Sequence, residues 1–151
     1  MNPEQPETIT HPVFGECRWE EERAVWFTQI RDAAGKWLDV SILLDEGDQS
    51  AALDRAADLY TRAIQAERQL LCTAAENELL ELYNDTWRRS DEPELKADEF
   101  ISRLEFTYIQ IRPDWDTAVI LSYEAGELFA GHAVDVELDR HLRYRDVDLI
   151  G

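Results

Sequence analysis

The sequence is short of positive charge. Its 15 lysines and arginines stand against 33 aspartates and glutamates, which gives a formal net charge of -18 over 151 residues. Nucleic acids bind proteins largely through neutralisation of their phosphates, so a chain this acidic is expected to be repelled by DNA and RNA. Anionic membrane surfaces are disfavoured for the same reason. We therefore expect neither nucleic acid nor membrane as a partner.

Long apolar runs are also missing. No uncharged apolar stretch approaches the ~18 residues that a membrane-spanning helix needs. Residues 1–15 contain neither the basic segment nor the apolar run of a signal peptide. We therefore expect a soluble, cytoplasmic protein. Cysteine is scarce too: Cys17 and Cys72 lie far apart in sequence and are expected to be free thiols in a reducing cytosol.

The motifs of several enzyme classes are absent. The six glycines are scattered, so no phosphate-binding loop is available, and no Gly-x-Ser-x-Gly sequence occurs. Residues 45–48 lack the ligand spacing of a calcium loop and are interpreted as a turn in which Asp48 caps a helix. No histidine has a second histidine three or four residues away, so there is no local zinc pattern. We expect no cofactor and no metal.

What the chain does contain is enough apolar material for one core. Hydrophobic residues make up 44% of the sequence, which is typical of a globular domain. We predict a single domain over residues 1–151, with residues 1–11 flexible. Alternating apolar patterns predict strands within residues 12–44 and over 106–112, 118–123, 127–138 and 142–149. Helical spacing runs from residue 49 to 92, and a short helix is predicted over 96–104.

This segregation of strands and helices predicts an α+β fold, with an antiparallel sheet built from N- and C-terminal strands and two to three central helices packed on it. A single helix of about 38 residues would be roughly 57 Å long. A compact sphere of this chain length would be only about 38 Å across. We therefore predict a break between residues 66 and 73.

Two acidic groups are candidate contacts for a partner. Asp135, Glu137 and Asp139 alternate with apolar residues, so they are predicted to share one face of a strand. Such a stripe is either a water-facing surface or a docking surface for the arginines and lysines of a partner, with metal binding as a remote third reading. The second group is a predicted hairpin tip in which Asp114 and Asp116 flank an exposed Trp115.

His132 follows Gly131 inside an apolar segment and is predicted to lie in a strand. A histidine in that setting is most often a structural group that bonds the backbone or a carboxylate. The other reading is a base or ligand, because an imidazole titrates near neutral pH.

Several phrases, in order along nearly the whole chain, resemble those of an uncharacterised bacterial family, domain of unknown function family 2262. They are His11-Pro12-Val13-Phe14-Gly15, Leu82-Tyr83-Asn84-Asp85-Thr86-Trp87, Asp91-Glu92-Pro93-Glu94-Leu95, Phe100-Ile101-Ser102-Arg103-Leu104, Gly126-Glu127-Leu128-Phe129-Ala130-Gly131-His132 and Asp146-Val147-Asp148-Leu149-Ile150-Gly151. The resemblance implies one α+β domain and no established activity. It draws attention to Asn84, Asp85, Trp87 and His132. Tyr83 and Trp87 are expected to form a ridge facing the core.

Two functions remain open at this point. The first is a non-enzymatic acidic binding protein, most concretely an immunity-type inhibitor that caps a basic partner such as a toxin, since opposite charge steers association. The alternative is a hydrolase-like enzyme, with or without a metal, that uses His132 with Asp135 or Asp85.

Overall fold

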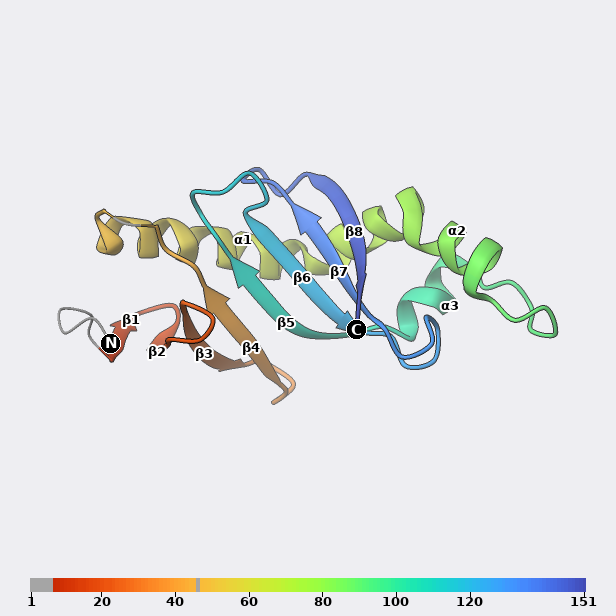
Figure 1. The fold of residues 1–151 in the computed structure, drawn as a ribbon, viewed down its shortest axis with the longest axis horizontal. Helices are drawn as coiled ribbons and strands as arrows, with labels where there is room; N and C mark the ends of the chain where they lie inside the picture. The colour runs from red at the N-terminus through yellow and green to blue at the C-terminus, as the bar shows by residue number, and fades with distance from the viewer. Residues whose placement is uncertain (1–6, 46) are drawn as a thin grey trace.

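The computed structural model describes residues 7–45 and 47–151, in which eight strands form one sheet ordered as they follow along the chain (Figure 1). The strands are β1 (Thr8–His11), β2 (Gly15–Glu20), β3 (Val25–Arg31), β4 (Trp37–Ile42), β5 (Glu105–Ile111), β6 (Val119–Glu124), β7 (Ala133–Leu138) and β8 (Tyr144–Ile150). The helical elements are α1 (Gln49–Ala74), the π-helical turn η1 (Ala75–Leu79), α2 (Leu80–Leu82), the π-helical turn η2 (Tyr83–Trp87) and α3 (Ala97–Ser102). The predicted α+β class is confirmed, although the sheet dominates the fold.

The sheet consists of two antiparallel meanders joined by one parallel pair. Strands β1 to β4 and strands β5 to β8 each pair with their neighbours along the chain. Between the meanders, β4 runs parallel to β5, with Val40 opposite Ile109. A parallel pair requires a long crossover, and the helical region supplies it. The prediction of a wholly antiparallel sheet is therefore corrected at this one junction.

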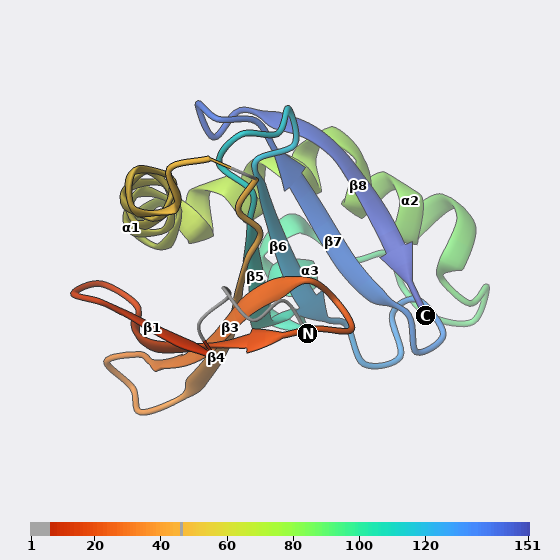
Figure 2. The same ribbon diagram turned by 60° about the vertical axis from the view of Figure 1, so that its left-hand side comes forward.

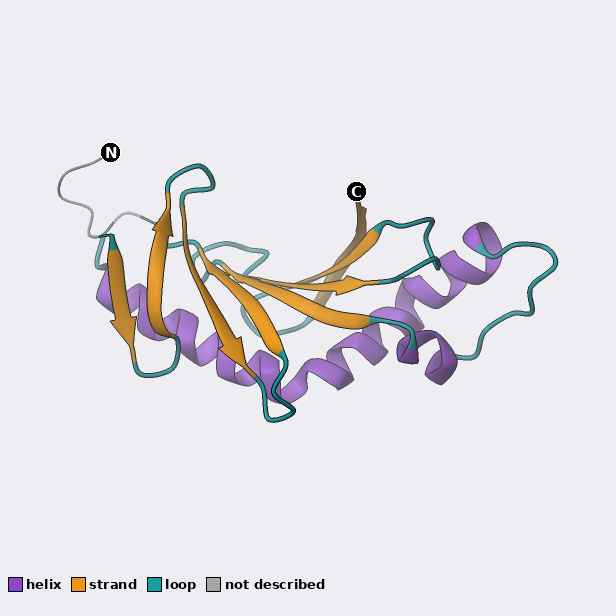
Figure 3. Ribbon diagram, turned by 90° about the horizontal axis from the view of Figure 1, so that it is seen from below, coloured by secondary structure: helices purple, strands orange, loops and turns teal. Residues whose placement is uncertain are grey.

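One face of the sheet is turned toward the helices (Figures 2 and 3), and its side chains are apolar and buried. A continuous row crosses five strands through Val40, Ile109, Leu121, Val136 and Val147, and all but Val147 are fully buried. Alternation along each strand sends the intervening residues to the other face, which we call the outer face. The outer face carries most of the polar and acidic side chains of the central strands.

The predicted break between residues 66 and 73 is wrong. Helix α1 runs unbroken from Gln49 to Ala74, and the helical run continues through η1, α2 and η2 to Trp87. Figure 1 shows it extending along the long axis of the molecule. The estimate that excluded such a helix assumed a sphere, whereas this molecule is elongated. In place of two to three central helices, one long helical run and the short α3 accompany the sheet.

The C-terminal half of the long run is wound more loosely than an α-helix. Buried and half-buried side chains recur at every fourth residue, at Leu71, Ala75, Leu79, Tyr83 and Trp87. In a regular α-helix each four-residue step overshoots a full turn by about 40°, so this stripe would rotate away from the sheet. The π-helical turns hold more residues per turn and offset that rotation. Their backbone bonds reach five residues back, from the Leu80 N–H to the Ala75 carbonyl and from the Arg88 N–H to the Tyr83 carbonyl.

Other predicted boundaries are partly right. Asp48 caps α1 as predicted, since its carboxylate accepts a hydrogen bond from the Ala51 N–H at 3.1 Å. The strand predicted over residues 127–138 begins only at Ala133, because residues 127–131 form turns with positive φ at Ala130 and Gly131. Of the segment expected to be flexible, residues 1–6 lie outside the described residues, while Thr8–His11 pair with β2.

The two cysteines agree with what the sequence indicated. Cys17 is buried, Cys72 is half-buried, and both are free thiols. Burial raises the pKa of Cys17 to about 11.

No helix within the described residues combines the length and the apolar character needed to cross a membrane.

The continuity of α1 can be tested with proline. Arg68→Pro, at an exposed position inside the formerly predicted break, should lower the free energy of unfolding by about 3 kcal/mol or more, because proline removes a helical hydrogen bond and clashes with the preceding turn. Gln49→Pro is the matched control. It places proline at the first helical position, after Asp48 in extended conformation, where proline is tolerated. Urea denaturation measures both, and equal tolerance of the two variants would contradict an unbroken helix.

Candidate functional site

The acidic residues of β7 face equally acidic residues of β8. Asp135 and Glu137 lie on the outer face, directly opposite Asp148 and Asp146 respectively. None of the four forms an ion pair with another described residue. Like charges directly opposite each other on neighbouring strands destabilise a sheet. We call these four residues the acidic face.

Sequence reasoning found half of this face. The alternation in residues 146–148 carries the same acidic-apolar-acidic signal as β7, but only the register of the strand pair shows that the two acidic rows meet. The pairing of Asp135 with Asp148 and of Glu137 with Asp146 was therefore missed.

Asp135 is the most enclosed member of the acidic face. Burial raises the pKa of its carboxyl and the nearby Asp148 raises it further, while a hydrogen bond from the Ser122 hydroxyl, at 2.6 Å, acts in the opposite direction. The net effect is a raised pKa, so this carboxyl holds its proton to a higher pH than a free aspartate does. The ionised form of Asp135 is therefore less favourable in the folded protein than in the unfolded chain, which lowers the free energy of unfolding at neutral pH.

Asp139 does not belong to the acidic face. It lies in the turn between β7 and β8, where one carboxylate oxygen accepts hydrogen bonds from the backbone N–H groups of His141 and Arg143. Its second oxygen accepts a bond from the Arg143 guanidinium at 3.0 Å. Burial opposes ionisation, but these bonds outweigh it and lower the pKa of Asp139. The prediction of a three-residue stripe is corrected because this side chain shapes the turn.

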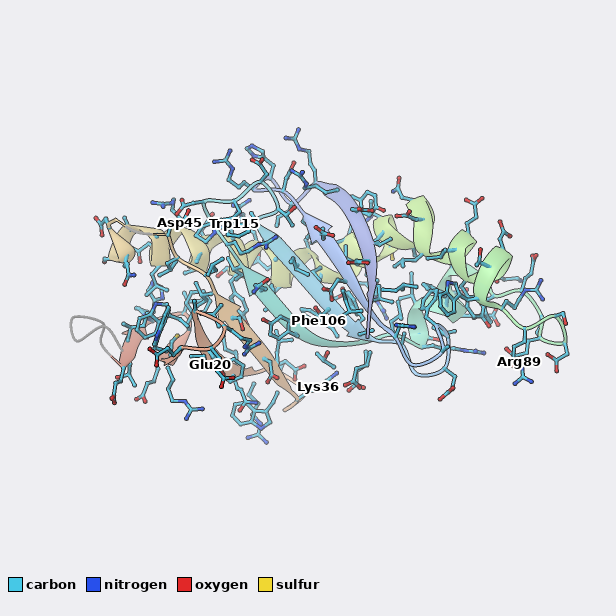
Figure 4. The ribbon with its side chains drawn as sticks, in the orientation of Figure 1. Glu20, Lys36, Asp45, Arg89, Phe106 and Trp115 are labelled. Atoms are coloured by element: carbon cyan, nitrogen blue, oxygen red, sulfur yellow. The ribbon has the colours of Figure 1, made fainter. Side chains whose placement is uncertain are left out.

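The predicted tip around Trp115 is a turn between β5 and β6. Trp115 is 43% exposed, its indole N–H donates to Asp45 at 3.3 Å, and the Arg112 guanidinium lies 4.5 Å from its ring centre. Figure 4 shows Asp45 and Trp115 next to each other at this end of the molecule. Asp114 is bound to Arg55 at 2.8 Å, whereas Asp116 is exposed. The tip therefore presents an indole and the carboxylate of Asp116, which has no ion pair among the described residues.

Arg112 connects this tip electrostatically with the acidic face. Burial lowers the pKa of its guanidinium, and the negative charge of Glu137 acts against that shift. Its Nε also donates to the Thr117 carbonyl at 3.0 Å, which fixes the side chain. The strand registers agree: Gln110 lies opposite Ile120 and Ile120 opposite Glu137. Arg112 follows Gln110 by two residues and lies over the Trp115 ring, so the tip adjoins the acidic face.

A second region brings together most of the phrases that resembled a known family. The Trp87 ring lies edge-on to Phe129 at 5.9 Å and to His132 at 5.7 Å between ring centres. Asn84 ties the following loop to η2, since its side chain both accepts from the Leu95 N–H and donates to the Leu95 carbonyl at 3.0 Å. The expected ridge of Tyr83 and Trp87 therefore faces the core, and Asn84 has a structural role.

Within the described residues, no carboxylate is hydrogen-bonded to His132. It precedes β7 rather than lying in a strand, and its Nδ1 is buried with no hydrogen-bond partner among the described residues. Neither Asp85 nor Asp135 is hydrogen-bonded to it within residues 7–45 and 47–151; Asp85 is exposed on η2, and Asp135 binds Ser122. In the same part of the chain, no group of three or more histidine, cysteine, aspartate or glutamate side chains could hold a metal ion.

Comparison with known proteins gave one match. The model of a family described as "Uncharacterized protein conserved in bacteria (DUF2262)" matches residues 11–149. No curated protein and no solved structure matches the chain.

The cost of the acidic face can be measured directly. Asp148→Asn removes the like charge opposite Asp135 and should raise the free energy of unfolding by about 0.2–1 kcal/mol. The gain should shrink in ~1 M salt, which screens exposed charges. The gain should also fall as the pH is lowered, because the raised pKa of Asp135 lets that carboxyl take up a proton, and lose the repulsion, at a higher pH than a free aspartate.

Urea denaturation at two pH values and two salt concentrations checks this. Asp116→Asn is the control, since it removes an exposed aspartate that has no ion pair among the described residues. An equal gain in the control would show that net charge, rather than the strand pair, sets the cost.

Proposed function

Because the chain belongs to the uncharacterised bacterial family DUF2262, no relative supplies an activity, and we propose a function from its own surface. The protein is a non-enzymatic acidic binding protein of the bacterial cytoplasm, most concretely an immunity-type inhibitor that neutralises a basic toxin. Its acidic face, with Trp115 beside it, docks onto the cationic surface of that toxin.

The observation that carries the proposal is the pairing of like charges across β7 and β8. Asp135 faces Asp148 and Glu137 faces Asp146, and none of these carboxylates has an ion-pair partner within the described residues. The repulsion between these carboxylates lowers the stability of the free protein. A partner that supplies cations would relieve this repulsion, so binding becomes more favourable. Arginines and lysines of a basic protein would convert the repulsion into attraction on binding.

Two further features favour a protein partner. The net charge of -18 is large for 151 residues, and a field of that sign attracts cationic proteins over a distance and raises the rate of encounter. The neighbouring tip presents a 43% exposed tryptophan and an arginine. Tryptophan and arginine are enriched among the residues that dominate binding energy at protein interfaces.

The enzyme alternative has less support. A histidine base that works with a carboxylate is oriented by a hydrogen bond from it, and neither Asp85 nor Asp135 is hydrogen-bonded to His132 among the described residues. The ring is instead packed edge-on against Trp87. We therefore do not propose a hydrolase.

Co-expression with the adjacent gene tests the proposal. If that gene encodes a toxin, the parent protein should suppress its lethality and form a complex with its product. The double variant Glu137→Lys/Asp148→Lys should lose protection and should associate at least about tenfold more slowly at low salt, because it reverses the charge at the docking surface.

The matched control is Glu76→Lys/Glu81→Lys, which makes the same change in net charge at exposed positions on η1 and α2. It should protect nearly as well as the parent. Stopped-flow measurements over a range of salt concentrations separate steering from contact, since steering weakens as salt rises. Absence of both protection and complex, or equal loss in the two double variants, would rule out docking through the acidic face.

A further inference from the structure

A cavity of about 510 Å³ lies at the end of the molecule formed by η2, the loop after it and the turn between β6 and β7. That volume falls within the range of small-molecule sites, which are mostly apolar and carry a few convergent polar groups. The cavity is separate from the acidic face.

The apolar floor of this cavity is held rigidly. Tyr83 and Trp87 line it from η2, and Leu128 lines it from the turn before β7. Phe129 packs edge-on against both aromatic rings, with ring centres 6.1 Å from Tyr83 and 5.9 Å from Trp87. Because η2 is a π-helical turn, Trp87 stays on the same side of the helix as Tyr83 rather than rotating away. Local π-helical turns are frequent at functional sites.

The loop that closes the cavity is fixed by its own hydrogen bonds. The Arg88 guanidinium donates to the Asn84 carbonyl at 3.2 Å and to the Glu92 carbonyl at 2.5 Å. Asn84 in turn holds Leu95 through two bonds. Arg88 is therefore used to build the wall, whereas its neighbour Arg89 lines the cavity. Figure 4 shows Arg89 at the far end of the molecule.

The rim of the cavity carries two charges of each sign. Arg89 and Arg103 supply guanidinium groups, and Glu92 and Glu127 supply carboxylates. Within the described part of the chain Arg103 and Glu127 form no ion pair, and the only ion pair of Arg89 is a long 3.8 Å contact with Asp91. Among the described residues, the Glu92 carboxylate has one hydrogen bond, a long one from the Tyr83 hydroxyl at 3.4 Å. Both kinds of charge are thus available to a ligand.

We propose that this cavity binds a free α-amino acid with an apolar side chain. Arg103 and Arg89 bind its carboxylate, since a guanidinium recognises a carboxylate through paired hydrogen bonds. Glu127 and Glu92 bind its ammonium group. The side chain lies on the floor formed by Tyr83, Trp87 and Leu128. A ligand with both charges on one carbon matches a rim whose own charges balance, whereas a simple anion or cation would leave two rim groups opposed to it.

Isothermal titration calorimetry on the whole chain tests this with three probes. L-Phenylalanine carries both charges, N-acetyl-L-phenylalanine keeps only the carboxylate, and L-phenylalaninamide keeps only the ammonium group. We expect L-phenylalanine to bind and each analogue to bind at least about tenfold more weakly, because each loses a charge-assisted contact. The analogues also represent the C-terminus and the N-terminus of a peptide, so equal or tighter binding of either would overturn the assignment to a free amino acid.

Two variants assign the contacts. Arg103→Gln should weaken L-phenylalanine about tenfold and leave the amide unchanged, while Glu127→Gln should weaken L-phenylalanine and leave the N-acetyl compound unchanged. Arg18→Gln is the control, at an exposed β2 arginine with no ion pair among the described residues. No binding of L-phenylalanine at millimolar concentration, or equal weakening by Arg18→Gln, would overturn the proposal. Neither outcome bears on toxin neutralisation, which the variants of the acidic face test.

Discussion

The structure depends on covering one apolar face of an eight-stranded sheet with a single long helical run. The inner row from Val40 through Ile109 and Leu121 to Val136 is fully buried, and a sheet with such a face is stable only when another layer shields it from water. One helical run from Gln49 to Trp87 supplies most of that layer. This run also forms the crossover between β4 and β5. The same segment therefore covers the core and connects the two meanders.

The difference between the two faces of the sheet explains why acidic residues lie on the outer face. With the inner face committed to packing, the outer face is free of volume constraints and can hold like charges such as Asp135 opposite Asp148. The far end of the helical run has a different character. There the π-helical winding keeps Tyr83 and Trp87 on one side, and a cavity with balanced charges forms beside them. The two surfaces differ in chemistry and in the elements that build them.

Local patterns in the sequence predicted the elements well and their assembly less well. Strand alternation, the Asp48 cap and the ridge of Tyr83 and Trp87 depend on residues close in sequence, so they could be predicted. The unbroken helix could not be predicted from a spherical estimate of size, although the four-residue repeat from Leu71 to Trp87 was a usable signal. A connection after residue 138 was predicted, but Asp139 was still assigned to the strand face, because its three hydrogen bonds within that turn depend on a turn geometry that the sequence pattern does not specify. The β8 half of the acidic face required a strand register.

The parallel seam between β4 and β5 has a consequence for how the chain reaches this state. Every other pair of neighbouring strands is connected by a short loop, so each meander can form from residues close in sequence. Bringing Asp39 next to Tyr108 requires closing the whole intervening segment, and the entropy of that closure is lost before the contacts compensate for it. We therefore expect the pairing of β4 with β5 to be the slow step of folding. Until β4 pairs with β5, each of these two strands has one unpaired edge, and an unpaired edge can pair with a strand of another chain.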